Sequence, residues 1–112
     1  MAQPLTVLRG TLDVLVLKAL TWAPMHGFEI TAWIEARATG NLDIVDSALY
    51  QSLYRLEARR AITADWGVTE NNRRARYYSI SPTGRAELRA ETARWNRYAE
   101  TVTGILNTPQ PA

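Results

Sequence analysis

The sequence predicts a mostly α-helical domain that carries one small β-hairpin. Four segments repeat apolar residues at spacings of three and four, as amphipathic helices do, and one stretch near residues 62–80 has the alternation of half-buried strands. The chain has 112 residues, 46% of them hydrophobic, which is enough for one compact core and too few for two. All of these elements are therefore expected to share one core.

Two helices are expected in the N-terminal third. The first runs from Thr11 to Trp22 and ends at Ala23-Pro24, because a residue before proline disfavours helical backbone. The second runs from about His26 or Gly27 to Ala38 and stops at Gly40-Asn41. Their apolar stripes consist of Leu8, Leu12, Leu15, Val16 and Ala19 in the first and Ile30, Trp33 and Ile34 in the second.

A third helix is expected from about Ser47 to Arg60, after a short and partly extended segment from Leu42 to Asp46. A side-chain oxygen of Asp46 or Ser47 is expected to cap its start. Leucines 49, 53 and 56 form its buried stripe. A second face is polar, since Ser47, Gln51 and Arg55 follow at steps of four with Tyr50 and Tyr54 beside them.

The hairpin is expected to pair residues 62–69 with residues 74–80 around the turn Glu70-Asn71-Asn72-Arg73, where asparagine tolerates left-handed backbone. Its tip is basic, with Arg73, Arg74 and Arg76. Arg76 has an alternative role, because it could pair with Glu70 or Asp65. Tyr77 and Tyr78 point to opposite faces, so at least one belongs to the core, and Tyr50 could be wedged against the second helix.

The last helix is expected to start with Ser81 as its cap and Pro82 in its first turn, and to run about 25 residues, roughly 37 Å, to Asn107. Residues 108–112 form a disordered tail. A heptad seam along the helix calls for a partner surface, such as the same helix or the first helix of a second copy. The alternative is that the helix folds back on its own domain. The expected interface comprises Leu8, Leu12, Leu88, Thr92, Trp95, Ala99, Val102 and Leu106.

Trp95 could either pack the centre of this seam or offer a flat surface to an aromatic effector. Val7, Gly10 and Val14 are the candidate walls of such a ligand pocket.

Composition excludes several kinds of site. There is no cysteine and only one histidine, His26, which precludes disulfides, thiol nucleophiles and a credible metal site. His26 precedes a helix, so a structural role at the helix end is expected. We find no nucleophile–base pair and no phosphate loop, so no enzyme, cofactor or metal is expected. No signal peptide or membrane span is expected either, and the predicted location is cytoplasmic.

Positive charge is concentrated in the middle of the chain. Residues 47–76 hold six bases and three acids, a balance of +3, whereas residues 1–46 hold three bases and five acids, a balance of −2. A polyanion would meet this middle segment, although a solvated basic surface is the simpler alternative.

Three helices, a hairpin and a final helix follow the order of a winged helix-turn-helix, here residues 1–81, with a dimerisation helix at 82–107. A helix fits the major groove of DNA, where Gln51 could read adenine and Arg55 guanine. Phosphates, thymine methyls or the minor groove would be contacted by Ser47, Tyr50, Tyr54, Asn72, Arg73, Arg74 and Arg76.

A homodimer would place two reading helices about 34 Å apart on palindromic double-stranded DNA. The expected function is therefore a sequence-specific DNA-binding regulator that acts as a homodimer, and a small hydrophobic or aromatic effector could bind beside Trp95. The alternative from another class is a protein-interaction adaptor that keeps the fold without specific DNA binding.

Six stretches of the chain match the pattern of one known family, and they are Leu8-Arg9-Gly10-Thr11-Leu12-Asp13, His26-Gly27-Phe28-Glu29-Ile30, Ala48-Leu49-Tyr50, Leu53-Tyr54-Arg55-Leu56-Glu57, Trp66-Gly67 and Arg73-Arg74-Ala75-Arg76-Tyr77-Tyr78 before Gly84. In these stretches the chain resembles the PadR family of transcriptional regulators, and more closely its short subfamily. The resemblance implies a bacterial homodimeric repressor with a basic wing, and an effector between subunits in some members. It also implies that Trp95 matches an interfacial tryptophan that stacks drugs in one relative.

Three residues depart from the family pattern. Gln51 replaces a usual proline, which bears on base preference, and Phe28 replaces a common tyrosine. Ala61 stands where glycine is frequent after the third helix, so a left-handed backbone there would be strained and the helix would have to end differently.

Overall fold

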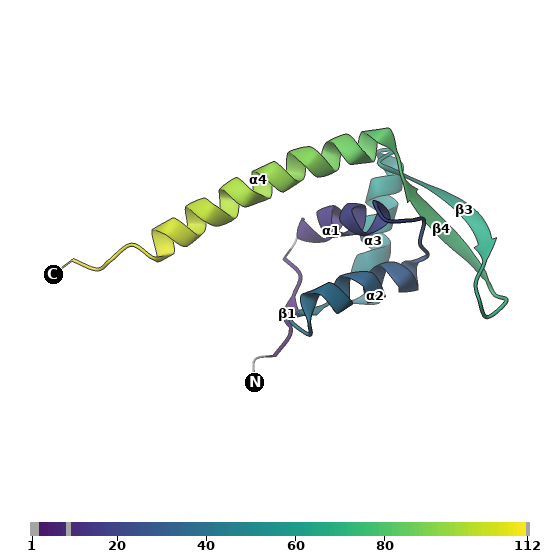
Figure 1. Ribbon diagram of the computed structural model, residues 1–112, viewed down its shortest axis with the longest axis horizontal. Coiled ribbons are helices and arrows are strands. Elements are labelled where there is room, and N and C mark those ends of the chain that lie inside the picture. The colour runs from purple at the N-terminus through teal and green to yellow at the C-terminus, as the bar shows by residue number, and fades with distance from the viewer. Residues whose placement is uncertain (1–2, 9, 112) are drawn as a thin grey trace.

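The computed structural model describes residues 3–8 and 10–111 and has the expected mostly helical architecture with one hairpin (Figure 1). Residues 1, 2, 9 and 112 lie outside this range, including Arg9 of the first motif and Ala112 of the predicted tail. The elements in order are β1 (Leu5–Thr6), α1 (Thr11–Leu20), α2 (Gly27–Ala38), β2 (Leu42–Asp43), α3 (Asp46–Ala58), β3 (Ile62–Val68), β4 (Arg74–Ile80) and α4 (Pro82–Leu106).

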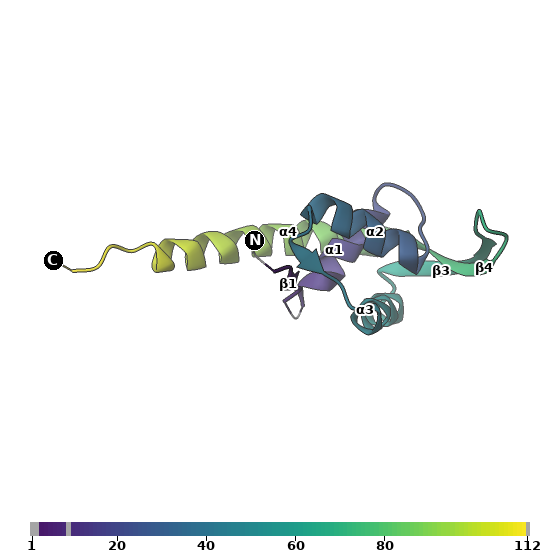
Figure 2. The same ribbon diagram turned by 90° about the horizontal axis from the view of Figure 1, so that it is seen from below.

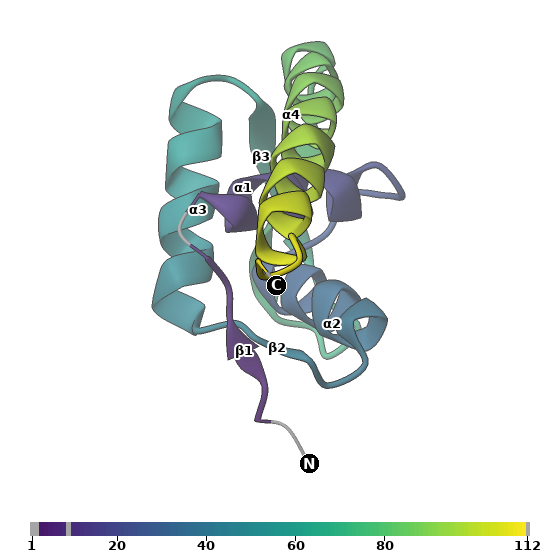
Figure 3. The same cartoon turned by 90° about the vertical axis from the view of Figure 1, so that its left-hand side faces the viewer.

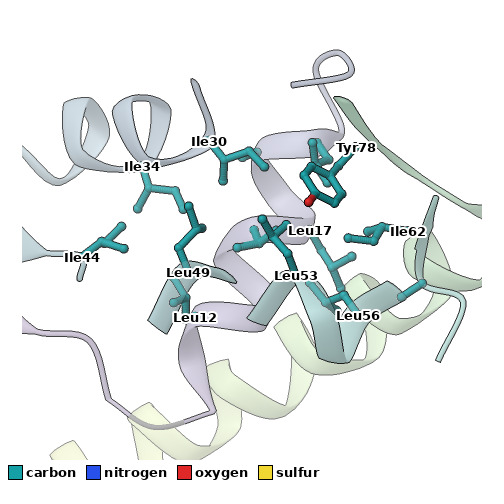
Figure 4. Close-up of a cluster of buried hydrophobic side chains, with 14 residues drawn as sticks. Leu12, Leu17, Ile30, Ile34, Ile44, Leu49, Leu53, Leu56, Ile62 and Tyr78 are labelled. Carbon is teal, nitrogen blue, oxygen red and sulfur yellow. The ribbon is translucent and has the colours of Figure 1, made fainter. Parts of the chain in front are cut away.

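The three helices α1, α2 and α3 enclose one hydrophobic core (Figure 4). The predicted leucine stripe of α3 is confirmed, since Leu49, Leu53 and Leu56 are all buried. The hairpin contributes Ile62 and Tyr78 to the same cluster, so Tyr78 is the core member of the tyrosine pair. The core therefore fixes α3 and the hairpin relative to each other.

Strands β3 and β4, which we call the wing, pair antiparallel with Ile62 opposite Ile80 and Val68 opposite Arg74. The turn between them holds Asn72 at φ 61°, the left-handed backbone expected of an asparagine in this turn. A backbone bridge between Met25 and Tyr78 ties the wing to the segment before α2. The wing is thus attached at its base and projects at its tip (Figure 2).

The starts of two helices confirm the expected cap at Ser81 and the expected structural role of His26. His26 Nδ1 accepts the backbone N–H of Glu29 at 3.3 Å, and Glu29 Oε1 accepts the backbone N–H of His26 at 3.1 Å. This reciprocal capping box confirms the structural role of His26. At the start of α4, Ser81 Oγ accepts the backbone N–H of Gly84 at 3.0 Å, with Pro82 next in the chain.

Two helix boundaries correct the sequence-based expectation. Helix α1 ends at Leu20 rather than Trp22. Helix α3 starts at Asp46 with Val45 as its cap residue and without a side-chain cap, so the expected capping by Asp46 or Ser47 is wrong. Both residues already lie in the first helical turn. There the carboxylate of Asp46 still stabilises the helix through its interaction with the positive end of the helix dipole.

The end of α3 explains how alanine replaces the frequent glycine. The left-handed residue is Arg60, at φ 62°, and not Ala61. The backbone N–H of Ala61 donates to the carbonyl of Leu56 at 2.9 Å, and that of Arg60 donates to the carbonyl of Glu57 at 3.0 Å, which is the bond pair of a Schellman-type helix end. Ala61 is completely buried, and its carbonyl accepts the backbone N–H of Ser81 at 3.0 Å, which joins the end of α3 to the start of α4.

A second, very short sheet was not predicted. Strands β1 and β2 pair in parallel, with Leu5 opposite Leu42 and Thr6 opposite Asp43. Only the extended character of the segment beginning at Leu42 was expected. The pairing draws the N-terminal strand alongside the α2–α3 connection (Figure 3).

Helix α4 has 25 residues and extends beyond the body formed by the other elements, as Figure 1 shows. The overall dimensions of 65 × 35 × 21 Å reflect this arm. Its first half packs against α1, and its last turns lie away from the other helices (Figures 1 and 2). Among residues 3–8 and 10–111, no helix combines the length and apolar character needed to cross a membrane.

Gly84 provides a test of the packing at the start of α4. A Cβ atom at this position would lie 2.1 Å from the carbonyl oxygen of Ala61, so backbone would have to move. We expect Gly84→Ala to lower the free energy of unfolding by about 2–3 kcal/mol, measured by urea denaturation. Gly104→Ala in the same helix meets no atom within 4 Å and should raise it by about 0.5–1 kcal/mol. Equal effects of the two substitutions would contradict this packing.

Candidate nucleic-acid interface

Helix α3 lies at the edge of the molecule with one flank uncovered (Figures 2 and 3). All five residues predicted for the reading face are exposed, namely Ser47, Tyr50, Gln51, Tyr54 and Arg55. Among them Tyr54 is 77% exposed. The leucines of the same helix are buried, so the expected polarity of the helix is present in the structure.

Tyr50 combines a packing contact with exposure. Its hydroxyl oxygen lies 2.9 Å from the position that a Cβ of Gly27 would occupy, so α2 and α3 approach closely because residue 27 is glycine. The side chain is nevertheless 55% exposed. Tyr50 therefore contacts the second helix, but the alternative in which only its hydroxyl is exposed is wrong, because the hydroxyl is the atom nearest Gly27 and more than half of the residue is exposed. The contact fixes the tyrosine at the border of the polar face.

Arg55 is held by a carboxylate from another helix. Its Nη2 donates to Oδ1 of Asp13 at 2.8 Å, and its Nε lies 3.4 Å from Oδ2 of the same residue. The Arg55 side chain remains 48% exposed and borders a surface hollow with Tyr50, Gln51 and Tyr54. Arg55 therefore belongs both to the polar face and to the α1–α3 contact.

Asp13 is the centre of a larger ion-pair network. Its Oδ1 accepts from Ser52 Oγ at 2.6 Å and its Oδ2 from Nη2 of Arg59 at 3.1 Å. Arg59 also donates from Nε to Oε1 of Glu87 at 2.9 Å, so the network extends from α1 through α3 to α4. The sequence analysis missed it, because 42 positions separate Asp13 from Arg55 and pairing at that distance has no periodic signal.

The protonation of Asp13 and Arg59 follows from these contacts. Burial by itself would raise the pKa of the Asp13 carboxyl, but the hydrogen bonds from Arg55, Ser52 and Arg59 outweigh burial and hold its pKa below the usual value. Hydrogen bonding to Glu87 raises the pKa of Arg59. Both groups are therefore charged throughout the physiological range.

The wing carries cations at its tip. Arg73 lies in the exposed turn, and the guanidinium carbon of Arg74 lies 4.6 Å from the ring centre of Trp66, which is 62% exposed. Asn72 is exposed in the same turn. Arg76 is less available, since its Nη2 donates to Glu57 Oε2 of α3 at 2.9 Å. The partner is thus Glu57 and neither of the two acids that the sequence suggested.

The predicted seam of α4 is only partly open in the single chain. Leu12 of α1 is a core residue at 7% exposure, so little of its side chain is left for a partner, and Leu88 is half-buried against that core. At Leu88 the alternative that α4 folds back on its own domain is correct. Beyond them, large apolar side chains remain exposed, among them Leu8, Trp95, Tyr98, Ile105 and Leu106.

Two adjoining hollows lie where α1, the N-terminal strand and α4 meet. Trp95 and Val14 line both of them, while Val7 lines one and Gly10 the other. The structure therefore brings together all four residues suggested as walls of a ligand pocket. Trp95 is 41% exposed, so one chain alone leaves these hollows open.

Comparison with known proteins identifies similar chains. The sequence model of the family described as the transcriptional regulator PadR-like family matches residues 16–90 of this chain. An uncharacterised protein from Lysinibacillus sphaericus is 28% identical over 96 residues, which cover 86% of this chain and 88% of that protein.

Two solved structures extend the similarity to the fold. A transcriptional regulator from Clostridium thermocellum is 26% identical with a TM-score of 0.77, covering 85% of this chain and 89% of that one. A PadR family transcriptional regulator from Eggerthella lenta is 29% identical with a TM-score of 0.73, covering 90% and 86%.

The depressed pKa of Asp13 predicts a pH-dependent stability. The carboxylate stabilises the fold fully above the unfolded pKa, near 3.9, and this contribution is lost as pH falls through the lower folded-state pKa. At pH 7 we expect Asp13→Asn to cost about 2 kcal/mol, a moderate value because both arginines are partly exposed. Urea denaturation should show the difference from wild type shrinking below about pH 4. A difference that stays constant with pH would contradict the assignment, and Asp65→Asn on the exposed wing is the matched control.

Proposed function

We propose that this chain, which belongs to the PadR-like family of transcriptional regulators, binds double-stranded DNA sequence-specifically through α3 and the wing. In this proposal it acts as a homodimeric repressor on a palindromic operator, and a small hydrophobic or aromatic effector releases it. The observation that carries the proposal is the polarity of α3, with leucines in the core and a polar face at the edge of the molecule.

The polar face suits the major groove. Gln51 can pair with the hydrogen-bonding edge of adenine, and Arg55 can pair with guanine acceptors. Ser47, Tyr50 and Tyr54 surround them with hydroxyl groups that suit phosphates, and the tyrosine rings offer apolar contact to thymine methyls. Direct readout by two adjacent side chains would give the specificity.

The wing supplies the sequence-independent part of the affinity. Arg73 and Arg74, with Asn72, are exposed at the tip, where long cations can reach the phosphate backbone or the minor groove. The Trp66 ring restrains Arg74 by a cation–π contact. Arg76 would take part only in addition to its pairing with Glu57.

Dimerisation through α4 is supported by the apolar side chains along its outer part. Ile105 and Leu106 are 67% and 76% exposed on an arm that extends beyond the body of the chain. A second copy can bury such a surface symmetrically, together with Leu8, Thr92, Trp95, Ala99 and Val102. The same interface would close the two hollows beside Trp95 and provide the effector site.

Substitutions on α3 and on the wing should have different effects on DNA binding. Gln51→Ala should weaken binding to the preferred duplex by about 1–3 kcal/mol and relax the preference at one base pair. Arg74→Ala should weaken all duplexes alike and reduce the salt slope by about 1. Fluorescence anisotropy at several salt concentrations, with a duplex selected from a random-sequence library, measures both.

The same titrations define the outcomes against the proposal. Identical behaviour of the two variants would contradict the separate roles of α3 and the wing. A wild-type protein that shows no affinity for duplexes at low ionic strength would instead favour the adaptor function.

Trp95→Ala should weaken the dimer and any binding of aromatic compounds, because the ring lines both hollows on the α4 face. Sedimentation equilibrium should show a larger fraction of monomer at a given concentration. Trp22→Ala is the control, since that ring is exposed at 68% just after α1 and lines neither hollow. An unaltered mass and an unaltered response of Trp95→Ala would remove both roles.

A further inference from the structure

The hydrogen bonds of Arg55 occupy only one edge of its guanidinium group. Nε and Nη2 face the carboxylate of Asp13, and Nη1 has no hydrogen-bond partner among residues 3–8 and 10–111. A guanidinium has five N–H donors in one rigid plane, so an acid on one edge leaves donors for a second acceptor. Arg55 can therefore keep Asp13 while it binds another group.

Asp13 is itself held in place from several directions. Its side chain is only 13% exposed, and it accepts hydrogen bonds from Ser52 and Arg59 as well as from Arg55. Its neighbour Leu12 is anchored in the core. The carboxylate cannot follow a moving arginine, so its position limits the directions in which the Arg55 guanidinium can point.

We propose that Asp13 is a positioning residue for DNA recognition, which fixes the guanidinium of Arg55 in the orientation that reads a base. The inference rests on the proposed function, since it assumes that α3 enters the major groove. A free arginine side chain loses rotamer freedom when it binds, and this loss weakens binding. Asp13 has already restricted the rotamers of Arg55, so a well-placed acceptor is bound at a smaller loss of entropy. A misplaced acceptor cannot be reached by the guanidinium and is bound less tightly.

The negative charge of Asp13 also increases the specificity of binding. An unpaired arginine attracts any phosphate, which strengthens binding to all sequences alike. The carboxylate offsets part of the charges of Arg55 and Arg59 and reduces this indiscriminate attraction. Because specificity is a difference between two affinities, restricting Arg55 and reducing non-specific attraction both increase it.

A double-mutant cycle tests the inference in the full-length chain. The probes are the duplex selected by the wild-type protein from a random-sequence library and the same duplex with each base pair replaced in turn. Discrimination at a base pair is the ratio of the affinity for the selected duplex to the affinity for the duplex with that base pair replaced. Arg55→Ala identifies the base pair that Arg55 reads by a loss of about 5- to 150-fold at that position.

Asp13→Asn should reduce discrimination at this same base pair by about five-fold or more, while binding to unrelated duplexes stays equal or becomes tighter. In the Arg55→Ala background, Asp13→Asn should change discrimination by less than about two-fold, because the group that it positions is absent. Should Asp13→Asn fail to fold, Asp13→Glu keeps the charge and displaces the carboxylate, and it should show the same coupling to Arg55.

Two controls separate positioning from general stability. Ser52→Ala removes one of the hydrogen bonds that hold Asp13 and should lower the melting temperature, while it reduces discrimination much less than Asp13→Asn because both arginine contacts remain. Glu87→Gln removes the negative charge that pairs Arg59 with α4 but leaves Arg55 on Asp13, and it should also keep discrimination.

The outcomes distinguish the inference from the proposed function. If Arg55→Ala loses discrimination and Asp13→Asn does not, or if the two substitutions act additively, Asp13 has no positioning role and the proposed function stands. If the wild-type protein selects no sequence, or Arg55→Ala leaves every base pair equally discriminated, then reading by Arg55 is wrong and the inference is overturned with it.

Discussion

Helix α3 has one face of leucines in the core and one exposed polar face, and the fold depends on holding the helix in the single rotation about its axis that keeps both faces in place. Leu49, Leu53 and Leu56 hold α3 in the core, while the residues between them stay on an uncovered flank. A helix that rotated about its axis would expose leucine and bury glutamine, at a cost of several kcal/mol. Asp13 of α1 opposes the same rotation from outside the core, because its carboxylate accepts hydrogen bonds from Ser52, Arg55 and Arg59 of the segment that forms and ends α3.

The same network gives α3 a mechanical link to the rest of the chain. Arg59 bonds both Asp13 of α1 and Glu87 of α4, and Glu57 of α3 pairs with Arg76 of the wing. Each ion pair adds little to the free energy of unfolding by itself, since one partner is exposed in every case. Together they join α3, the wing and α4 into one unit.

Periodicity was sufficient to predict the helices and the hairpin, because the apolar stripes of α1 to α3 and the alternation in β3 are local signals. It could not show contacts between distant segments, such as the β1–β2 pair or the Asp13–Arg55 pair. Cap residues gave a mixed result. Ser81 caps α4 as expected and His26 has the expected structural role at a helix start, although its reciprocal bonds with Glu29 were not predicted. Helix α3 begins one residue earlier than its polar residues suggested.

Chemical-shift mapping of the isotope-labelled chain with its selected duplex tests the central claim most directly. The account predicts that the backbone amides of α3 and of the wing turn shift or broaden on addition of DNA, along with the side-chain amide of Gln51, while the amides of the last turn of α4 stay unchanged. Shifts confined to α4, or a spectrum unaffected by the duplex, would contradict the claim that α3 is the surface that reads DNA.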